Sequence, residues 1–329
     1  MNFISLISFI ISLFFFDFKV ADKIYITKVS NGIELKQALK TAKPGDHILL
    51  NDGLYQGNFE IDASVSGAKN KPIKLTGSRN AILDGNTIQN GYVLHVKANF
   101  WEIKGITIRN GLKGLVTDEA SYNIVNQVLV TQIGEEAIHF RKFSKYNIVK
   151  NSEVSYTGLK NPGYGEGIYI GTAYSNWSKI SNGEPDKCDS NQIINNKIGP
   201  FVAAECIDIK EGTTGGIIRG NTFESKGITG ANSADSWIDV KGNYYTIENN
   251  TGNNTQPSVL LDGYQVNCAY NGWGCNNEFK NNNSNVNAQG HGFNIRLKSS
   301  KGAAIGNIIY SNNKVKGAVM GVANVPLSK

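Results

Sequence analysis

Residues 206–211 read CIDIKE and residues 237–242 read WIDVKG, so one short pattern occurs twice, 31 residues apart (239 − 208). In both copies apolar residues alternate with Asp and Lys, and the pattern ends in a polar residue or Gly. Related segments are VLHVKA (93–98), AIHFRK (137–142), GIYIGT (167–172) and GFNIRL (292–297), with weaker copies LVTDEA (115–120) and VLLDG (259–263). The chain is therefore built from a repeated unit.

Each copy is followed by a second short strand and a turn that contains Asn, such as QIINN (192–196) or TIENN (246–250). Repeats of about 20–25 residues with such short strands are typical of a stacked solenoid. Asn and Gly suit the corners because they tolerate left-handed backbone conformations, and stacked Asn side chains can hydrogen-bond along the stack. We expect an all-β fold, a single-stranded right-handed parallel β-helix over residues 22–329, capped by a helix at residues 35–40, with Ile33 on its buried face.

Strand alternation assigns directions to the side chains, because neighbouring residues of a strand point to opposite faces. Ile207, Ile209, Ile238 and Val240 face the core, and the residues between and after them face outward. Alignment of the copies predicts three outward columns. They are His95, His139, Tyr169, Asp208 and Asp239; then Lys97, Arg141, Gly171, Lys210 and Lys241; and, at the corner before the strand, Glu136, Glu166, Glu205 and Ser236.

The N-terminal segment has an apolar run from Phe3 to Phe16 that ends at Asp17. Such a run is short for a membrane span and suits a signal peptide, which we place at residues 1–21; a signal anchor is the alternative. We therefore expect a secreted monomer with no membrane contact after cleavage. The net charge of +6 is compatible with a polyanionic partner, whereas the basic residues are too sparse for nucleic acid.

Four cysteines fit a secreted protein, and we expect pairs Cys268–Cys275 and Cys188–Cys206, one of three connectivities. Asn-x-Ser/Thr sequences at Asn176, Asn249, Asn253 and Asn282 are acceptor sites for N-glycosylation in a eukaryotic secretory route.

The N-terminal helix, short core strands, Asn corners and polar outward face resemble the pectate-lyase-like superfamily of secreted β-helices. Within the chain, ECIDIKEGTTGGIIRGNTFESKG (205–227) resembles a segment of the chondroitinase B and alginate lyase family. The resemblance implies a catalytic base at Lys210. That family has an Arg one coil later, in a Leu-Arg-His strand, whereas this chain has Lys241 and no His.

The outward columns suit β-elimination on a polysaccharide that contains uronic acid. Loss of the C5 proton requires neutralisation of the uronate charge and a base with a lowered pKa, and a second cation near a lysine has that effect. We expect Lys210 as the base, tuned by Lys241, and carboxylates as Ca²⁺ ligands. Arg141 and Arg296 would grip substrate carboxylates. The full set of candidates is Lys210, Lys241 and Arg141 as catalytic residues, Tyr169, Trp237, Tyr264, Trp273, His139 and Arg296 as substrate-binding residues, and Asp208, Asp239, Glu205 and Glu166 as metal ligands.

Three other interpretations stay open at this point. The Asp and Lys columns would also serve as a solvated ion-pair ladder, worth about 0–1 kcal/mol per pair. A polygalacturonase-like hydrolase is suggested by QGHGF (289–293) and IRLK (295–298), but the Asn-Thr-Asp and Asp-Asp motifs of such enzymes are missing, and Asp208 and Asp239 would be only about 5 Å apart. A non-catalytic carbohydrate-binding or cell-wall protein would keep the same groove.

Overall fold

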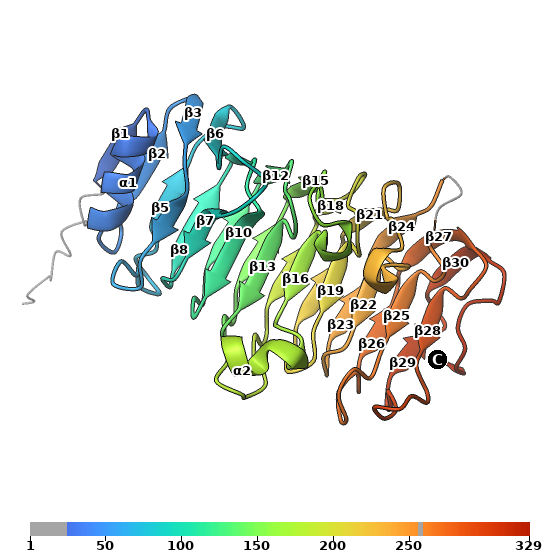
Figure 1. Ribbon diagram of the computed structural model, residues 1–329. Coiled ribbons are helices and arrows are strands. Elements are labelled where there is room, and N and C mark those ends of the chain that lie inside the picture. The colour runs from blue at the N-terminus through green and yellow to red at the C-terminus, as the bar shows by residue number, and fades with distance from the viewer. Residues whose placement is uncertain (1–24, 256–258) are drawn as a thin grey trace, which may run out of the picture.

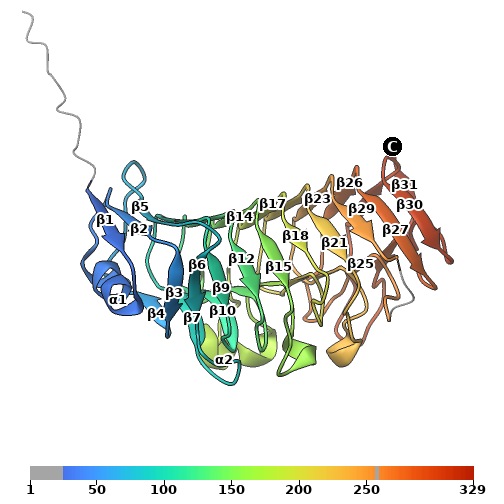
Figure 2. The same cartoon turned by 90° about the horizontal axis from the view of Figure 1, so that it is seen from above.

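The repeated strand stacks on its copies from neighbouring coils, so that all strand pairs between coils run parallel and the chain forms a right-handed β-helix (Figure 1). The computed structural model describes residues 25–255 and 259–329. The predicted signal peptide, residues 1–21, lies outside the described residues. Figure 2, turned from Figure 1, shows the elongated body with helix α1 (Gly32–Thr41) at one end and the C-terminus at the other.

Three parallel sheets form the walls of the solenoid. The sheet that carries the sequence motif, called the motif sheet below, contains β4 (Phe59–Ile61), β7 (Tyr92–Val96), β10 (Lys113–Asp118), β13 (Ile138–Arg141), β16 (Ile168–Ile170), β19 (Ile207–Ile209), β22 (Ile238–Val240), β25 (Tyr264–Val266) and β28 (Phe293–Ile295).

A second sheet contains β1 (Ile26–Val29), β2 (His47–Leu50), β5 (Ile73–Thr76), β8 (Trp101–Lys104), β11 (Ile124–Asn126), β14 (Ile148–Lys150), β17 (Gln192–Ile194), β20 (Ile217–Arg219), β23 (Thr246–Glu248), β26 (Glu278–Lys280), β29 (Ile308–Tyr310) and β31 (Leu327–Ser328). The third contains β3 (Gly53–Gln56), β6 (Ala81–Asp84), β9 (Thr107–Arg109), β12 (Leu129–Thr131), β15 (Glu153–Ser155), β18 (Lys197–Ile198), β21 (Thr222–Glu224), β24 (Thr251–Asn253), β27 (Asn283–Ala288) and β30 (Lys314–Ala318).

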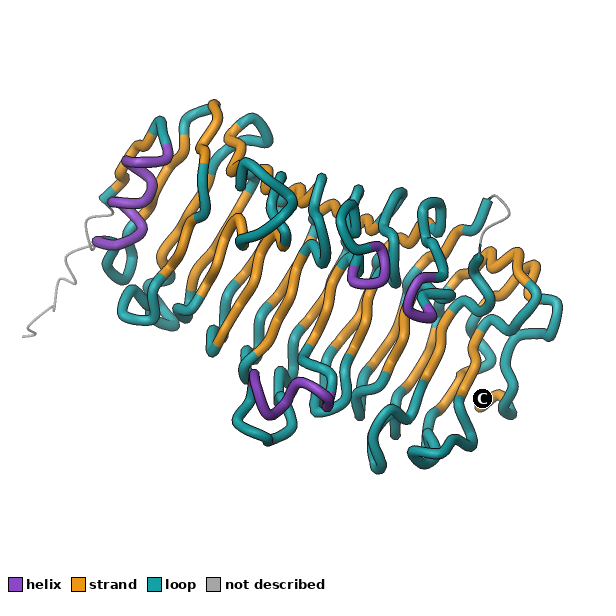
Figure 3. The backbone as a smooth tube through the Cα atoms, in the orientation of Figure 1, coloured by secondary structure: helices purple, strands orange, loops and turns teal. Residues whose placement is uncertain are grey.

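Besides α1, the described part of the chain has four short helical segments, all in loops beside the sheets (Figure 3). They are η1 (Pro162–Tyr164), η2 (Tyr174–Asn176), α2 (Trp177–Ile180) and η3 (Ala231–Ser233). Figure 3 shows α2 on one side of the motif sheet and other short helices on the opposite side. Among the described residues, no helix is long and apolar enough to span a bilayer.

The predicted capping helix is confirmed, with one correction. Asn31 caps α1 because its side-chain oxygen accepts from the backbone N–H groups of Ile33 and Glu34. Leu35 and Leu39 are buried against the first coil, as expected. Ile33, however, is 83% exposed, because it lies in the first turn on the side away from the sheets.

Buried asparagines form the ladders that the corner residues predicted. Asn196, Asn221, Asn250, Asn282 and Asn313 lie one above the next, and each side-chain N–H donates to the side-chain oxygen of the next at 2.9–3.0 Å. Each amide also donates to a main-chain carbonyl, as Asn250 does to Ile218 at 2.9 Å. These bonds satisfy buried polar groups at the same corner of five successive coils. Because Asn282 is fully buried in the ladder, its predicted role as a glycosylation site is wrong.

The core corrects three further expectations. Trp237 and Tyr264 are completely buried, so neither is a platform for sugar binding. Tyr264 stacks on Phe293 at 4.7 Å between ring centroids, because it occupies an inward position of its strand. Trp237 fills space that Gly252 leaves free. All four cysteines are free thiols: Cys188 points to Asp186 and Cys206 to the Ile198 carbonyl, so the predicted disulfides are not formed.

Candidate active site

The predicted columns are in register on the outward face of the motif sheet. Asp208 pairs with Tyr169 in the preceding coil and with Asp239 in the following coil. The preceding strand continues the column with His139 opposite Tyr169. These residues are brought together only because inserted loops of different lengths return each strand to the same position. The site therefore draws on β13, β16, β19 and β22.

Two lysines and two aspartates form a continuous chain of ion pairs at the centre of this face. Asp208 is almost fully buried; its Oδ2 accepts from Lys210 Nζ at 2.6 Å and its Oδ1 from Lys241 Nζ at 2.8 Å. Lys241 also donates to Asp239 Oδ2 at 2.5 Å. Asn267 Nδ2 supplies Asp239 Oδ1 at 2.8 Å. Every carboxylate oxygen of the two aspartates thus has a donor.

The lowered pKa that we expected for Lys210 is wrong. Burial by itself would lower the pKa of this lysine, but Asp208 at 2.6 Å, together with Asp239 and Glu166, raises it above the ordinary value. The pKa of Lys241 is raised in the same way by Asp208 and Asp239 against the opposing effect of burial. Burial tends to raise the pKa of Asp208, and the two ammonium groups outweigh it and lower that pKa. All these groups are therefore charged in the resting site.

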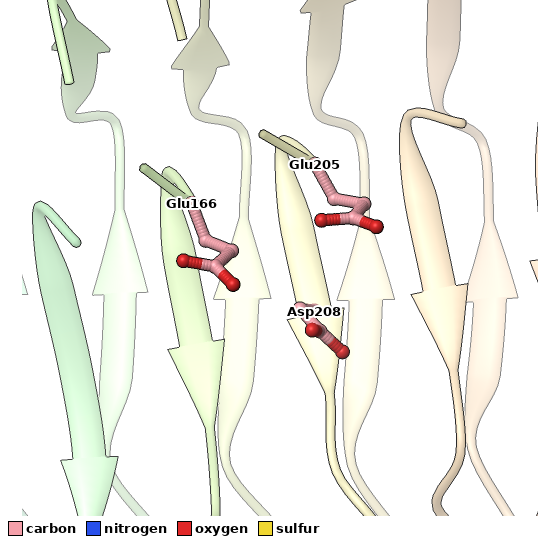
Figure 4. Close-up of side chains that lie close together, drawn as sticks. All are labelled: Glu166, Glu205 and Asp208. Carbon is pink, nitrogen blue, oxygen red and sulfur yellow. The ribbon is translucent and has the colours of Figure 1, made fainter. Parts of the chain in front are cut away.

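Glu166 and Glu205 lie at the starts of β16 and β19, next to this network (Figure 4). One oxygen each from Glu166, Glu205 and Asp208 lies within 4.8 Å of the others. Glu205 is buried rather than placed at an exposed corner. Burial and Asp208 raise its pKa to about 8. Burial, Glu136 and Asp208 raise the pKa of Glu166 well above its ordinary value, and its Oε2 has no hydrogen-bond partner among the described residues.

Tyr169 lies between the lysine network and His139. Lys210 Nζ is 4.8 Å from the centre of the Tyr169 ring. On the other side, the His139 ring packs edge to face against the Tyr169 ring, with 4.5 Å between the ring centroids. Burial and the anions Asp208 and Glu166 raise the pKa of the Tyr169 phenol well above its ordinary value, so the phenol keeps its proton. His139 is fixed by a 3.0 Å hydrogen bond between its Nε2 and the Gly171 carbonyl oxygen.

Arg141 and Arg296 lie on either side of this centre. Both were expected to bind substrate carboxylates, and neither is placed as a free cation next to Lys210. Arg141 already binds a carboxylate through two nitrogens, because its Nε and Nη2 donate to the two oxygens of Asp118 at 2.5 and 3.0 Å. Its Nη2 also donates to the Tyr92 hydroxyl at 3.1 Å. Arg296 is exposed beyond β28, three strands after β19 in the motif sheet, and does not join the Lys210 network.

Sequence reasoning missed three polar residues that complete the columns. Asp118 belongs to a weak copy of the motif, and it orders Arg141. Gln265 and Asn267 extend the columns past Asp239 because β25 covers Tyr264–Val266, directly after the predicted VLLDG copy at 259–263. The signal was the YQV alternation of residues 264–266, which adjoins the VLLDG segment predicted as the copy.

Comparisons with known proteins agree with this fold. The family model described as "Pel9A-like, right handed beta helix region" matches residues 22–167. The crystal structure of an alginate lyase from Paenibacillus sp. str. FPU-7 is similar over 92% of this chain and 99% of that chain, with 37% identity and a TM-score of 0.81. The chain belongs to the family of this alginate lyase.

Two other solved structures support the fold alone. Pectate lyase Pel9A is 16% identical over 94% of this chain and 80% of its own, with a TM-score of 0.66. The PL6 family alginate lyase AlyGC is 17% identical over 92% of this chain and half of its own, with a TM-score of 0.54. No curated protein matches the sequence. The polysaccharide lyase is thus a right-handed β-helix whose polar centre lies on the motif sheet.

Proposed function

We propose that this polysaccharide lyase cleaves a polymer of uronic acids by β-elimination, with alginate as the first candidate substrate. The observation that carries the proposal is the pair of partly buried ammonium groups, Lys210 and Lys241, held side by side on the outward face by Asp208. A uronate carboxylate placed over this pair would be neutralised, and its C5 proton would become more acidic. The 37% identical relative, an alginate lyase over nearly its whole length, supports the choice of substrate.

The proposed reaction transfers one proton and breaks one sugar linkage. Lys210 in its neutral form takes the C5 proton while the C4–O bond breaks and a double bond forms between C4 and C5. The departing oxygen receives a proton from the Tyr169 phenol, which the raised pKa keeps protonated. Lys241 stays charged and neutralises the substrate carboxylate. Arg141, held by Asp118 and Tyr92, supports the groove next to this centre.

The anions around Lys210 determine when it can act as a base. Asp208 lies on its own strand, Asp239 and Lys241 belong to the next coil, and Glu166 and Tyr169 to the previous coil. Burial opposes the ammonium form of Lys210, but the three carboxylates Asp208, Asp239 and Glu166 outweigh it and raise the pKa of this lysine. The neutral, basic form of Lys210 therefore increases as the pH rises, and we expect faster cleavage on the alkaline side of neutrality.

The four carboxylates proposed for Ca²⁺ do not fit the ion as a set. Asp208 and Asp239 already accept from two ammonium groups and an amide, so the lysines occupy the place that a cation would take between them. Glu166 and Glu205 alone would leave a calcium ion with far fewer than its usual six to eight oxygen ligands. We therefore derive no step of the reaction through a metal.

A polysaccharide outside the cell would be the substrate if residues 1–21 direct secretion, as the apolar run of the leader predicts. A secreted lyase acts on extended chains, and the open, outward-facing position of the site on the solenoid wall is compatible with such a chain.

The test is to incubate the purified protein with alginate, polymannuronate, polyguluronate and polygalacturonate and to follow the ultraviolet absorbance of the new double bond. We expect activity on at least one of them, and a loss of about 100- to 10,000-fold in kcat for Lys210→Met. Lys145→Met, which removes a lysine paired with Asp189 away from the motif sheet, is the control and should stay active. New reducing ends without unsaturation would contradict the proposal and indicate a hydrolase.

A further inference from the structure

A second recess lies beside the Lys210 centre, toward the N-terminal end of the motif sheet. It has a volume of about 370 Å³, within the range of small-ligand pockets. Tyr169 lines it and also contacts Lys210, so the recess and the proposed cleavage point share a wall. Its floor comes from β10, β13 and β16, three neighbouring rungs that span about 10 Å.

Two loops raise walls on either side of this floor. Tyr164 of η1 lines one side, and Lys179 of α2 lines the other. The α2 loop is anchored: Trp177 is buried and donates through its ring N–H to the Thr172 carbonyl at 2.8 Å. Asn161, just before η1, donates to Glu135 Oε1 at 2.5 Å. Both loops are thus anchored next to the floor strands, and Lys179 lines a formed recess.

The charges of the recess single out Lys179. Lys113 is paired with Glu135 at 3.1 Å and also with Glu136, and Arg141 is paired with Asp118. Among the described residues, no hydrogen bond or ion pair joins Lys179 to another side chain, and it is exposed. The lining contains three permanent cations, Lys113, Arg141 and Lys179, against two carboxylates, Glu135 and Glu136. Without Lys179 the cations of the lining would no longer outnumber its anions.

We propose that the recess binds the uronate residue adjacent to the one that is cleaved, and that Lys179 pairs with its carboxylate. Tyr164 offers an aromatic face to the sugar ring from the opposite wall. This inference rests on the proposed function, since it takes the polymer to be a uronan that lies along the motif sheet. It adds a specificity role for a loop residue that the strand motif does not contain.

The test compares Lys179→Met, which keeps most of the side chain but removes its charge, with Lys179→Arg. On alginate, or on whichever uronan the wild type cleaves best, we expect Lys179→Met to raise KM about 5- to 20-fold with kcat changed less than about twofold. Lys179→Arg should keep KM within about threefold. Lys187→Met is the matched control, because Lys187 lies in the same loop, is exposed and does not line the recess. It should behave as the wild type does.

Substrate length gives the sharper readout. Oligomers too short to fill the recess should be cleaved equally by the wild type and Lys179→Met, and the difference should appear only when one more uronate is added. An effect of Lys179→Met that equals that of Lys187→Met, or one that is the same at every length, would overturn the inference.

A binding measurement separates this inference from the proposed function. Calorimetric titration of saturated mannuronate oligomers into Lys210→Met, with and without Lys179→Met, needs no turnover. If the wild type cleaves no uronan, the proposed function is wrong, yet oligouronate binding that depends on Lys179 would still support the recess as an anionic-sugar site. Equal affinity of the two variants, or equal binding of a neutral cello-oligosaccharide, would overturn it.

Discussion

At the scale of single residues, Asp208 organises the proposed active site. Its two oxygens hold Lys210 at 2.6 Å and Lys241 at 2.8 Å, and its burial makes the loss of either partner costly. The same carboxylate raises the pKa of Lys210. Asp208 therefore both places the proposed base and restrains it, which the repeated Ile-Asp-x-Lys pattern by itself does not reveal.

Replacement of Asp208 by Asn should shift the dependence of the rate on pH. An amide keeps the shape but removes the anion, so the pKa of Lys210 falls and its neutral form appears at lower pH. We expect the rising limb of the kcat/KM profile to move to lower pH by about one unit or more. The measurement is an initial-rate series on alginate across neutral and alkaline buffers.

The control for this experiment is Asp189→Asn, which removes the anion of a surface pair with Lys145 and should leave the profile in place. Movement of a falling limb instead, with the rising limb unchanged, would mean that Lys210 acts as the ammonium ion and not as the base. Thermal unfolding of both variants checks that the fold is intact.

At the scale of structural elements, the Asn ladders join coils whose strands are only two to six residues long. Each rung satisfies one side-chain oxygen, one main-chain N–H and one main-chain carbonyl, as Asn250 does with Asn282 and Ile218. Short strands would otherwise leave these corner groups buried without partners. The ladder thus keeps successive motif strands at the same height, which is what aligns Asp208 with Asp239.

Asn250→Ala should destabilise the protein because it removes a rung from the middle of the ladder. Buried groups of Asn221 and Ile218 would lose their partners, and we expect a loss of about 2–4 kcal/mol in the free energy of unfolding. Urea denaturation followed by circular dichroism measures it. Asn70→Ala, at an exposed turn residue, is the comparison and should change stability by less than about 0.5 kcal/mol. Equal stability of the two variants would show that the ladder contributes little.

At the scale of the whole molecule, the solenoid converts sequence repeats into a continuous wall with a charged centre. Two lysines balance Asp208 and Asp239 there, so cations of the protein's own chain take the positions that a metal would need. The recess at Lys179 and the Lys210 centre lie along the same sheet and share Tyr169. A polymer bound along this wall would contact both.

Removal of divalent metal should therefore leave the protein active. After dialysis against EDTA, we expect activity on alginate within about twofold of the untreated protein and an unchanged unfolding temperature. The reason is that Asp208 and Asp239 already form ion pairs with Lys210 and Lys241. Loss of activity that Ca²⁺ restores and Mg²⁺ does not would contradict this expectation and return the four carboxylates to the role of ligands.

The sequence alone determined the solenoid, the capping helix, the Asn ladders and the outward columns, because strand alternation and corner residues are local properties that recur every coil. It also indicated Lys210 and Lys241 together. Only the tertiary structure decided that Trp237 and Tyr264 are core residues, that the cysteines are free thiols, and that Arg141 is already held by Asp118. The reason is that burial, pairing and pKa depend on what the neighbouring coils and loops place around a side chain. In ECIDIKE and SWIDVKG, the expected metal ligands Asp208 and Asp239 are paired with Lys210 and Lys241 instead. The pKa of Lys210, which was expected to be lowered, is raised by these neighbours.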